Sequence, residues 1–294
     1  MTLLGGRYEL GEVIGCGGMA EVYLGRDQLL GRQVAIKVPH LSLVRDPTFR
    51  RRFAREAKLA ARLNHPAIVR VYDTDEADLS APTGGQVRVP FIVMERVVGH
   101  PLGDLSLDGL PVDRALGIVC DVLAALELAH EAGVVHRDIK PANVMIAASG
   151  AVKVMDFGIA RSVTGTGTTT EGVIGTAAYL SPEQALGKRV DTRSDLYSAG
   201  CLLFELLTGR PPFVGDSPVE VVYAHVNDTP PRPSSLAPHL PPVLDEVVAK
   251  ALAKDCDARY PSAATFRADL DTVRRDPTTR PPGLPKPPAD PPTA

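Results

Sequence analysis

Apolar and polar positions alternate over roughly the first ninety residues, with turn residues between the runs. YELGEVIG, EVYLGRD and QVAIKV each show this period of two, which predicts strands of an antiparallel sheet. One helix interrupts the pattern. Asp46 and Pro47 supply a capping residue and a proline at the first helical position, and the helix is expected to run through TFRRRFAREAKLAARLN.

From about residue 110 the apolar spacing becomes that of helices, as in DRALGIVCDVLAALELAHEAG, RSDLYSAGCLLFELLTG and PVLDEVVAKALAK. The sequence therefore predicts an α+β fold with two lobes that share a cleft. We expect a short N-terminal segment (1–7), a small β-rich lobe with one helix (about 8–97) and a larger helical lobe (about 98–275). The length of 294 residues suits two lobes better than a single core.

Three stretches are expected to lie outside the core. Residues 276–294 hold eight prolines and predict an extended or disordered tail, or a linker toward a further segment. Residues 162–172, SVTGTGTTTEG, predict a mobile loop. Residues 75–90 are expected to form a connection longer than the fold needs.

Composition places the chain among soluble globular proteins, with 44% hydrophobic and 23% charged residues. The net charge of −3 does not favour nucleic acid as a partner. Cys16, Cys120, Cys201 and Cys256 form no CxxC pair, which argues against zinc and disulfides and fits a reducing cytoplasm. Neither a signal peptide nor an apolar run long enough to span a membrane is evident.

A glycine-rich stretch, IGCGGMAEV, occupies residues 14–22. Gly15, Gly17 and Gly18 lack side chains, so backbone N–H groups there can approach phosphate oxygens. A dinucleotide-binding fold would need a helix directly after the glycines, whereas EVYLGRD predicts a strand. An ordinary glycine hairpin remains the alternative, and Cys16 is interpreted as a small filler rather than a redox sensor.

Lys37 and Glu56 are a candidate pair. In the strand VAIK, Ala35 and Lys37 share one face, so the lysine has room to reach a ligand under the sheet. In the following helix, Glu56 interrupts an apolar stripe and needs a cation or a route to water. The alternatives are a surface lysine and a solvated glutamate at the edge of the stripe.

VVHRDIKPANVMI, residues 134–146, places charged side chains between two apolar runs. The strand VMI is expected to pair with VKVM, residues 152–155, which would bring Asp138 and Asn143 near Asp156. Two carboxylates and an amide suit Mg²⁺ bound together with phosphate oxygens, and leave one carboxylate to orient a hydroxyl nucleophile. A purely structural network of turn residues is the alternative.

GTAAYLSPEQ, residues 175–184, follows the threonine-rich loop. Threonines there would accept phosphate, which Arg137 and Arg161 would hold through charge-assisted hydrogen bonds. A solvated Thr/Gly loop is the alternative.

Taken together and in order, these motifs resemble the eukaryotic-like, Hanks-type protein kinases. The resemblance covers about residues 8–273 and six motifs: a Gly-rich loop, VAIK, the helix glutamate, HRDxKxxN, DFG and a variant of APE. Details such as GGMAEVY and HRDIKPANVMI are similar to bacterial Ser/Thr kinases, particularly actinobacterial receptor-type ones.

The resemblance implies a bilobal kinase fold and a site for ATP with Mg²⁺ or Mn²⁺. Asp138 would be the catalytic base, Lys140 would contact the γ-phosphate, Lys37 would pair with Glu56, and Thr176 would support the catalytic loop. Asn143 and Asp156 would bind the metal. The residues implied in nucleotide binding are Ile14, Gly15, Cys16, Gly17, Gly18, Met19, Ala20, Glu21, Val22, Ala35, Lys37, Met94, Glu95, Val97, Asn143, Met145 and Asp156.

Regulation and partners are likewise implied by the resemblance. Thr168, Thr169 and Thr170 fall where relatives carry activating phosphothreonines, so autophosphorylation between two molecules is expected, with pairing through the small lobes as one arrangement. Protein substrates are expected, and a membrane only if a segment beyond this chain tethers it. Glu183 would pair with Arg259.

Two residues depart from the family pattern: Ala20 replaces the third loop glycine, and Ser181 replaces the alanine of APE. Both are small, so activity is expected. A pseudokinase scaffold is disfavoured because Lys37, Asp138 and the metal residues are present, and a small-molecule phosphotransferase because GTAAYLSPEQ resembles a docking loop for proteins.

Overall fold

The structure is a computed structural model that describes residues 2–80, 84–107, 109–157 and 177–284. It divides into two compact units, one formed by Met1–Ser106 and Leu128–Ala177, the other by Leu107–Glu127 and Ala178–Ala294. The division therefore differs from the predicted boundary near residue 97. The physical reason is that Val154 bonds to the chain at residues 67–69, in the first part of the same unit: its N–H donates to Ala67 O (2.8 Å) and its carbonyl accepts from Val69 N (2.9 Å).

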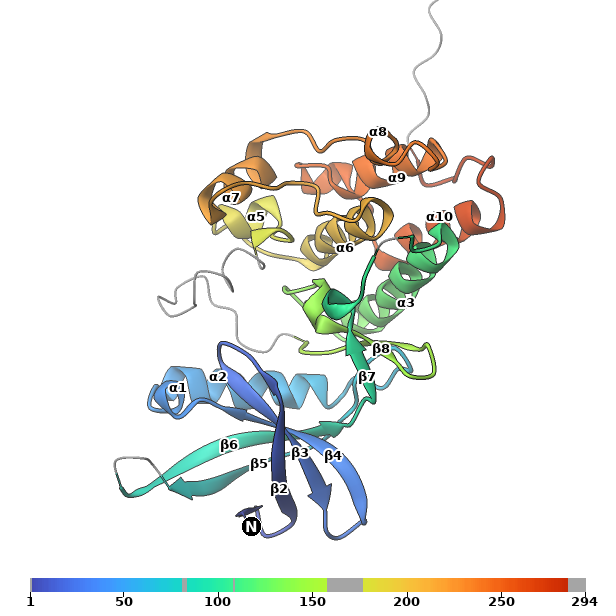
Figure 1. The fold of residues 1–294 in the computed structure, drawn as a ribbon. Helices are drawn as coiled ribbons and strands as arrows, with labels where there is room; N and C mark the ends of the chain where they lie inside the picture. The colour runs from blue at the N-terminus through green and yellow to red at the C-terminus, as the bar shows by residue number, and fades with distance from the viewer. Residues whose placement is uncertain (1, 81–83, 108, 158–176, 285–294) are drawn as a thin grey trace, which may run out of the picture. The chain divides into compact units, whose positions relative to one another are not determined.

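The first unit contains an antiparallel six-stranded sheet in the order β1-β2-β3-β4-β6-β5 (Figure 1). Its strands are β1 (Thr2–Leu4), β2 (Tyr8–Cys16), β3 (Ala20–Asp27), β4 (Arg32–Pro39), β5 (Val71–Ser80) and β6 (Gln86–Glu95). The predicted alternation in β4 is confirmed. Val34, Ile36 and Val38 are buried in one apolar cluster and Ala35 in another, because successive side chains of a strand point to opposite faces.

The stretch 75–90 is a correction to the sequence analysis. It is mostly a long β-hairpin in which β5 pairs with β6, with Asp75 opposite Phe91 and Ser80 opposite Gln86. Val89 and Phe91 of β6 are each 1% exposed, so β6 is fixed in the core. The acidic residues of β5 form a strand because they pair with β6.

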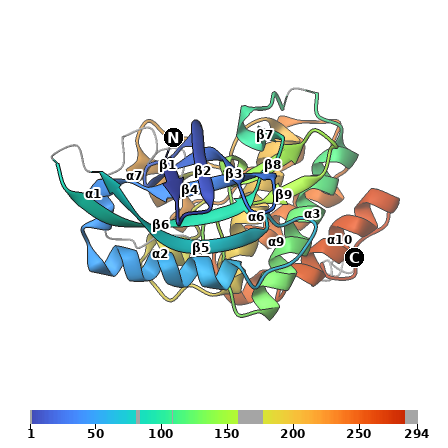
Figure 2. The same cartoon turned by 90° about the horizontal axis from the view of Figure 1, so that it is seen from below.

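Two helices follow β4 in this unit: α1 (Leu41–Val44) and α2 (Pro47–Ala60). The predicted start of α2 is confirmed, since the Asp46 carboxylate accepts from Thr48 N at 2.8 Å. The helix ends at Ala60, four residues before the predicted end. It runs beside β5 (Figure 2) and buries Phe49, Phe53 and Ala57 against Ile92 of β6.

A second sheet, β7-β8-β9, completes the first unit. It is formed by β7 (Gly99–Pro101), β8 (Val144–Ala147) and β9 (Val152–Val154), with the short 3-10 turns η1 (Leu102–Asp104) and η2 (Pro141–Asn143) beside them. The predicted pairing of VMI with VKVM is confirmed, since Val144 lies opposite Val154 and Met145 opposite Lys153.

The second unit is helical (Figure 1). Its elements are α3 (Val112–Glu131, whose last turn belongs to the first unit), α5 (Pro182–Ala185), α6 (Thr192–Thr208), α7 (Pro218–Asn227), α8 (Pro233–Leu236), α9 (Val243–Ala251), η3 (Cys256–Ala258) and α10 (Ala263–Arg275). α6 is its buried centre and carries Asp195, which is 0% exposed. The predicted pair of Glu183 and Arg259 is confirmed, with two contacts of 2.8 Å.

Residues 276–284 also differ from the predicted tail. Leu284 is buried, and Gly283 N donates to Asp269 Oδ1 at 3.0 Å. Lys250 of α9 donates to Gly283 O, and Arg280 bonds Glu246 at 2.6 Å. This segment, which we call the C-terminal strap, therefore packs on α9 and α10 despite its prolines.

Candidate active site

The glycine-rich turn between β2 and β3 is held at its tip. Gly17 N donates to Ala20 O at 2.9 Å, which closes the turn. His40, directly after β4, contacts Gly17 O through its ring Nε2 at 2.8 Å and donates its backbone N–H to Met19 O at 3.0 Å. Met19 also packs on the apolar cluster of α2. The strand–turn–strand prediction for residues 14–22 is thus confirmed, and the tip is tied to the chain that follows β4.

An apolar cluster lies on the face of β4 that carries Ala35. Its buried members are Ala35, Val69 and Met94, and Val22, Val97 and Met155 pack against it. Four of these side chains, Val22, Ala35, Met94 and Val97, are among the residues that the resemblance implies in nucleotide binding, with Val22 and Ala35 expected against the adenine. Met145 is half-buried on β8, and its adenine contact stays a prediction.

For Glu95 to Val97, directly after Met94, the resemblance implies a hinge whose backbone binds adenine. Glu95 is anchored from two sides: its carboxylate bonds Lys153 at 2.8 Å and accepts from Arg70 N at 3.2 Å, while its own N–H donates to Arg70 O at 2.8 Å. These bonds position the hinge backbone, whose N–H and C=O groups are the natural partners of an adenine edge.

Buried His136 organises the HRD stretch. Its Nε2 contacts Met155 O at 2.9 Å, its Nδ1 accepts from Asp138 N at 3.2 Å, and its ring packs edge-on against Phe157 at 4.7 Å. The His136 ring therefore connects Asp138, the expected catalytic base, to residues 155–157, which include the DFG motif. The sequence analysis gave His136 no role.

Two polar residues, Lys140 and Asn143, converge on Asp138. Its Oδ2 lies 2.9 Å from Lys140 Nζ and accepts from Asn143 Nδ2, also at 2.9 Å. The same Nδ2 donates to the Asp138 carbonyl at 2.7 Å. Lysine and amide thereby fix the orientation of a carboxylate whose side chain is 22% exposed and open to a substrate hydroxyl.

Asp156 lies across the β8–β9 hairpin and meets Lys37, with Nζ 2.6 Å from Oδ1. Met155 N donates to Asn143 O at 3.0 Å, so the two stretches are bonded at this point. Asp156 and Arg137 have φ of 64° and 68°, the left-handed region that non-glycine residues seldom adopt. Such strain concentrates at functional sites.

Asn143 and Asp156 fit the predicted Mg²⁺ site. Both Asn143 Nδ2 hydrogen bonds go to Asp138, which leaves amide Oδ1 as the atom with ligand character. Asp156 adds a carboxylate, and hard oxygen donors are those that Mg²⁺ prefers. Two protein ligands are also what this ion commonly takes beside phosphates.

Several predicted site residues fall outside what the structure describes: the side chain of Glu56, together with Arg161, Thr168, Thr169, Thr170 and Thr176. The Lys37–Glu56 pair therefore stays a prediction, and Asp156 is the partner that the structure gives Lys37. Arg137 is exposed, and its phosphate-binding role also stays a prediction.

From Ala178 onward, the described part of GTAAYLSPEQ is fixed within the second unit. Tyr179 OH donates to Glu205 at 2.5 Å, and Ser198 Oγ donates to Tyr179 O at 2.7 Å. Burial raises the pKa of Glu205. Ser181 caps α5 by accepting from Gln184 N, a bond that alanine could not make, so this departure from the APE pattern adds a helix cap.

Comparison with protein families decides the relationship. The family model described as the protein kinase domain matches residues 8–268. The chain belongs to the protein kinase family.

Similar sequences carry the same assignment. This kinase domain is 58% identical to a probable serine/threonine-protein kinase of Streptomyces coelicolor, over 91% of this chain and 40% of that protein. It is 54% identical to the serine/threonine-protein kinase PknB of Mycobacterium tuberculosis, over 96% of this chain and 45% of that protein. The chain thus spans less than half the length of these relatives.

The fold comparison agrees. The kinase domain matches the crystal structure of the Mycobacterium tuberculosis PknI kinase domain with a TM-score of 0.72 and 32% identity, covering 92% of this chain and 97% of that one. Within the described ranges, no helix is long and apolar enough to cross a membrane. The four cysteines are free.

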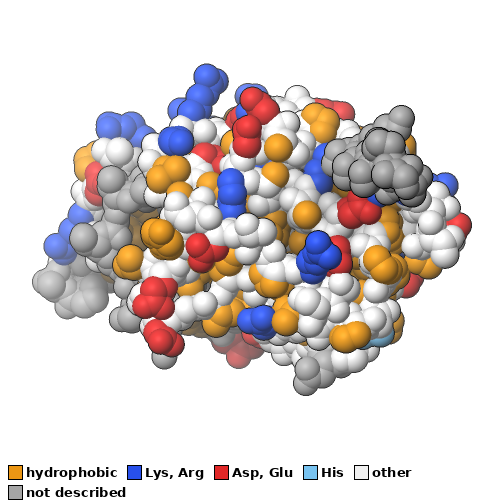
Figure 3. Space-filling model, turned by 90° about the horizontal axis from the view of Figure 1, so that it is seen from above, with side chains coloured by type: hydrophobic (Ala, Val, Ile, Leu, Met, Phe, Trp, Pro, Cys, Tyr) orange, Lys and Arg blue, Asp and Glu red, His pale blue; other side chains and the backbone are white. Residues whose placement is uncertain are grey.

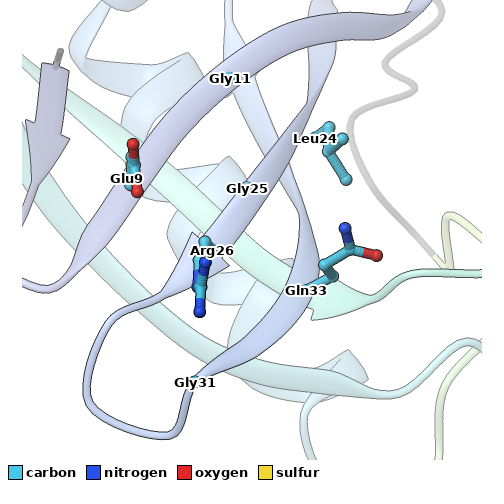
Figure 4. Close-up of a pocket in the computed structure, with 7 residues that line it drawn as sticks. All are labelled: Glu9, Gly11, Leu24, Gly25, Arg26, Gly31 and Gln33. Carbon is cyan, nitrogen blue, oxygen red and sulfur yellow. The ribbon is translucent and has the colours of Figure 1, made fainter.

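A separate hollow of about 480 Å³ lies at β2, β3 and β4 of the kinase domain (Figure 4). It is lined by Glu9, Gly11, Leu24, Gly25, Arg26, Gly31 and Gln33. The Glu9 carboxylate bonds Gln28, and none of the predicted site residues lines this hollow. We therefore attach none of the predicted catalytic roles to this hollow.

Proposed function

We propose that this kinase domain transfers the γ-phosphoryl group of ATP to serine and threonine hydroxyls of proteins. The observation that carries the proposal is the convergence of Lys140 and Asn143 on Asp138, beside the Lys37–Asp156 pair. In this proposal Asp138 accepts the hydroxyl proton of the substrate, and Lys140 neutralises charge on the transferred group.

The nucleotide would lie with its adenine against the cluster of Ala35 and Met94, bound by the hinge at Glu95–Val97 and covered by the glycine-rich turn. Lys37 would hold the α and β phosphates and pair with Glu56. Asn143 and Asp156 would hold Mg²⁺ or Mn²⁺, which shields the phosphate charge when bound. The protein then contributes mainly by positioning and by electrostatic stabilisation.

Activation is proposed to occur by autophosphorylation of Thr168, Thr169 or Thr170 between two molecules, with Arg137 and Arg161 receiving the phosphate and Thr176 supporting the catalytic loop. Pairing through the β-rich unit is supported by Leu3, Leu29 and Leu30, which are 51%, 74% and 58% exposed. The free cysteines support action in a reducing cytoplasm, with a membrane tether only through a segment beyond this chain.

The test is incubation with labelled ATP and Mg²⁺ and a generic protein substrate, followed by mass spectrometric mapping. Asp138→Asn should abolish transfer, whereas Asp78→Asn, an exposed carboxylate on β5, should leave it intact. Label on the substrate but not on residues 168–170 would refute autophosphorylation alone. No label in wild type, with ATP still bound, would refute the kinase activity.

A further inference from the structure

The outer face of α2 carries a row of cations. Its inner face is buried, whereas Arg51, Arg55 and Lys58 are exposed, as is Arg62, two residues beyond the end of the helix. The spacings of four and three residues place Arg51, Arg55 and Lys58 within an arc of about 60° at 3.6 residues per turn, and Arg62 follows four residues after Lys58. We call these four residues the basic row.

The basic row has no counter-charge within the described part of the chain: none of its four side chains joins an ion pair. Arg50, on the flank of the same helix, pairs with Glu76 at 2.8 Å. On the molecular face seen in Figure 3, by contrast, acidic and basic side chains are interspersed. Like charges three and four residues apart repel, so stability of the helix does not account for the basic row.

We propose that the basic row is a docking surface for an acidic segment of a partner protein. The helical part of the row, from Arg51 to Lys58, extends over about 10 Å at 1.5 Å per residue, and carboxylates repeated on a partner helix at the same spacing would match these charges. Ala54 and Ala61 lie beside the row and leave room for another backbone.

A polypeptide suits the basic row better than a lipid surface. A helix that lies in a membrane interface presents large apolar side chains next to its cations. Within the described residues, none of the exposed large apolar side chains belongs to α2. The chemistry of the row is therefore electrostatic alone, which an acidic peptide satisfies without insertion.

The experiment measures fluorescence anisotropy of a labelled helical peptide with Glu at positions i, i+4, i+7 and i+11, and of its Gln counterpart, with the 294-residue chain at low and high salt. The test variant removes the row: Arg51→Gln, Arg55→Gln, Lys58→Gln and Arg62→Gln. A control variant removes four exposed cations elsewhere: Arg26→Gln, Lys188→Gln, Arg189→Gln and Arg210→Gln.

The wild type and the control variant should bind the Glu peptide, with affinity falling as salt rises. The row variant should bind about tenfold more weakly or worse, from four lost pairs at exposed sites. The proposal is overturned if the wild type prefers neither peptide, if the control variant loses as much affinity, or if vesicles of phosphatidylserine and phosphatidylcholine bind the row while the Glu peptide does not.

Discussion

Replacing Glu183 by glutamine should destabilise the second unit by about 3 to 5 kcal/mol, because Arg259 would stay buried without its counter-charge. The side chains of Arg259 and Glu183 are 0% and 7% exposed. Arg259 donates to five acceptors, two of them the Glu183 oxygens. Glutamine can accept only one of those two bonds and turns an N–H toward the other donor.

The pKa of Glu183 gives an independent magnitude. Burial alone raises this pKa, but hydrogen bonds from Arg259 and Ser194 outweigh it and lower the value to about 2, from 4.5 for an ordinary glutamate. At 1.36 kcal/mol per pKa unit, the difference corresponds to about 3 kcal/mol. This stability is present above pH 4.5 and is lost as the pH falls toward 2.

Urea unfolding at neutral pH and at pH 3 measures both effects. The matched control is Glu246→Gln, which removes the exposed pair with Arg280, where the side chains are 44% and 35% exposed, and should cost at most about 1 kcal/mol. The reasoning would be refuted if the Glu183 and Glu246 variants had equal unfolding free energies. It would also be refuted if the difference in unfolding free energy between wild type and the Glu183 variant were no smaller at pH 3 than at neutral pH.

Three further outcomes are expected. Lys37→Met should lower phosphoryl transfer by about 100-fold or more, with the unfolding free energy little changed, in a steady-state assay beside urea unfolding. His40→Ala should raise KM for ATP about 2- to 10-fold at unchanged kcat, and His40→Gln should restore it by donating to Gly17 O again; a fall in kcat instead would contradict the tether. Gly283→Ala should lower the melting temperature, because a Cβ there would lie 2.4 Å from Asp269 Oδ2; an unchanged temperature would show that the C-terminal strap is not docked.

The sequence pattern correctly predicted those elements whose structure depends on residues close together in the chain. The alternation in β4 fixed which side chains face the α2 side of the sheet and which do not, and the β8–β9 hairpin followed from two short apolar runs around a turn. These predictions brought Asp138, Asn143 and Asp156 together correctly. The helix cap at Asp46 was equally local.

The features that the sequence pattern did not predict depend on contacts between residues far apart in the chain. The connection expected at residues 75–90 includes most of β5, whose Asp75 and Asp78 are exposed at the sheet edge, and pairing with buried β6 makes this segment a strand. The many prolines of the C-terminal strap predicted a disordered tail. The strap is instead held by Asp269, which accepts a hydrogen bond from Gly283 N and lies 14 positions away in the sequence. The contact of His40 with Gly17 spans 23 positions and has no local signature.

Met19, in the glycine-rich turn, packs against the apolar cluster of α2, so the conformation of the turn and the packing of the helix are coupled. If nucleotide binding shifts the turn, the packing of α2 changes with it, so the two events are linked. Linkage is reciprocal: a ligand of α2 that tightens ATP binding by some factor must itself be bound more tightly, by the same factor, once ATP is present. ATP would then act as an effector of whatever binds the helix, as well as a phosphoryl donor.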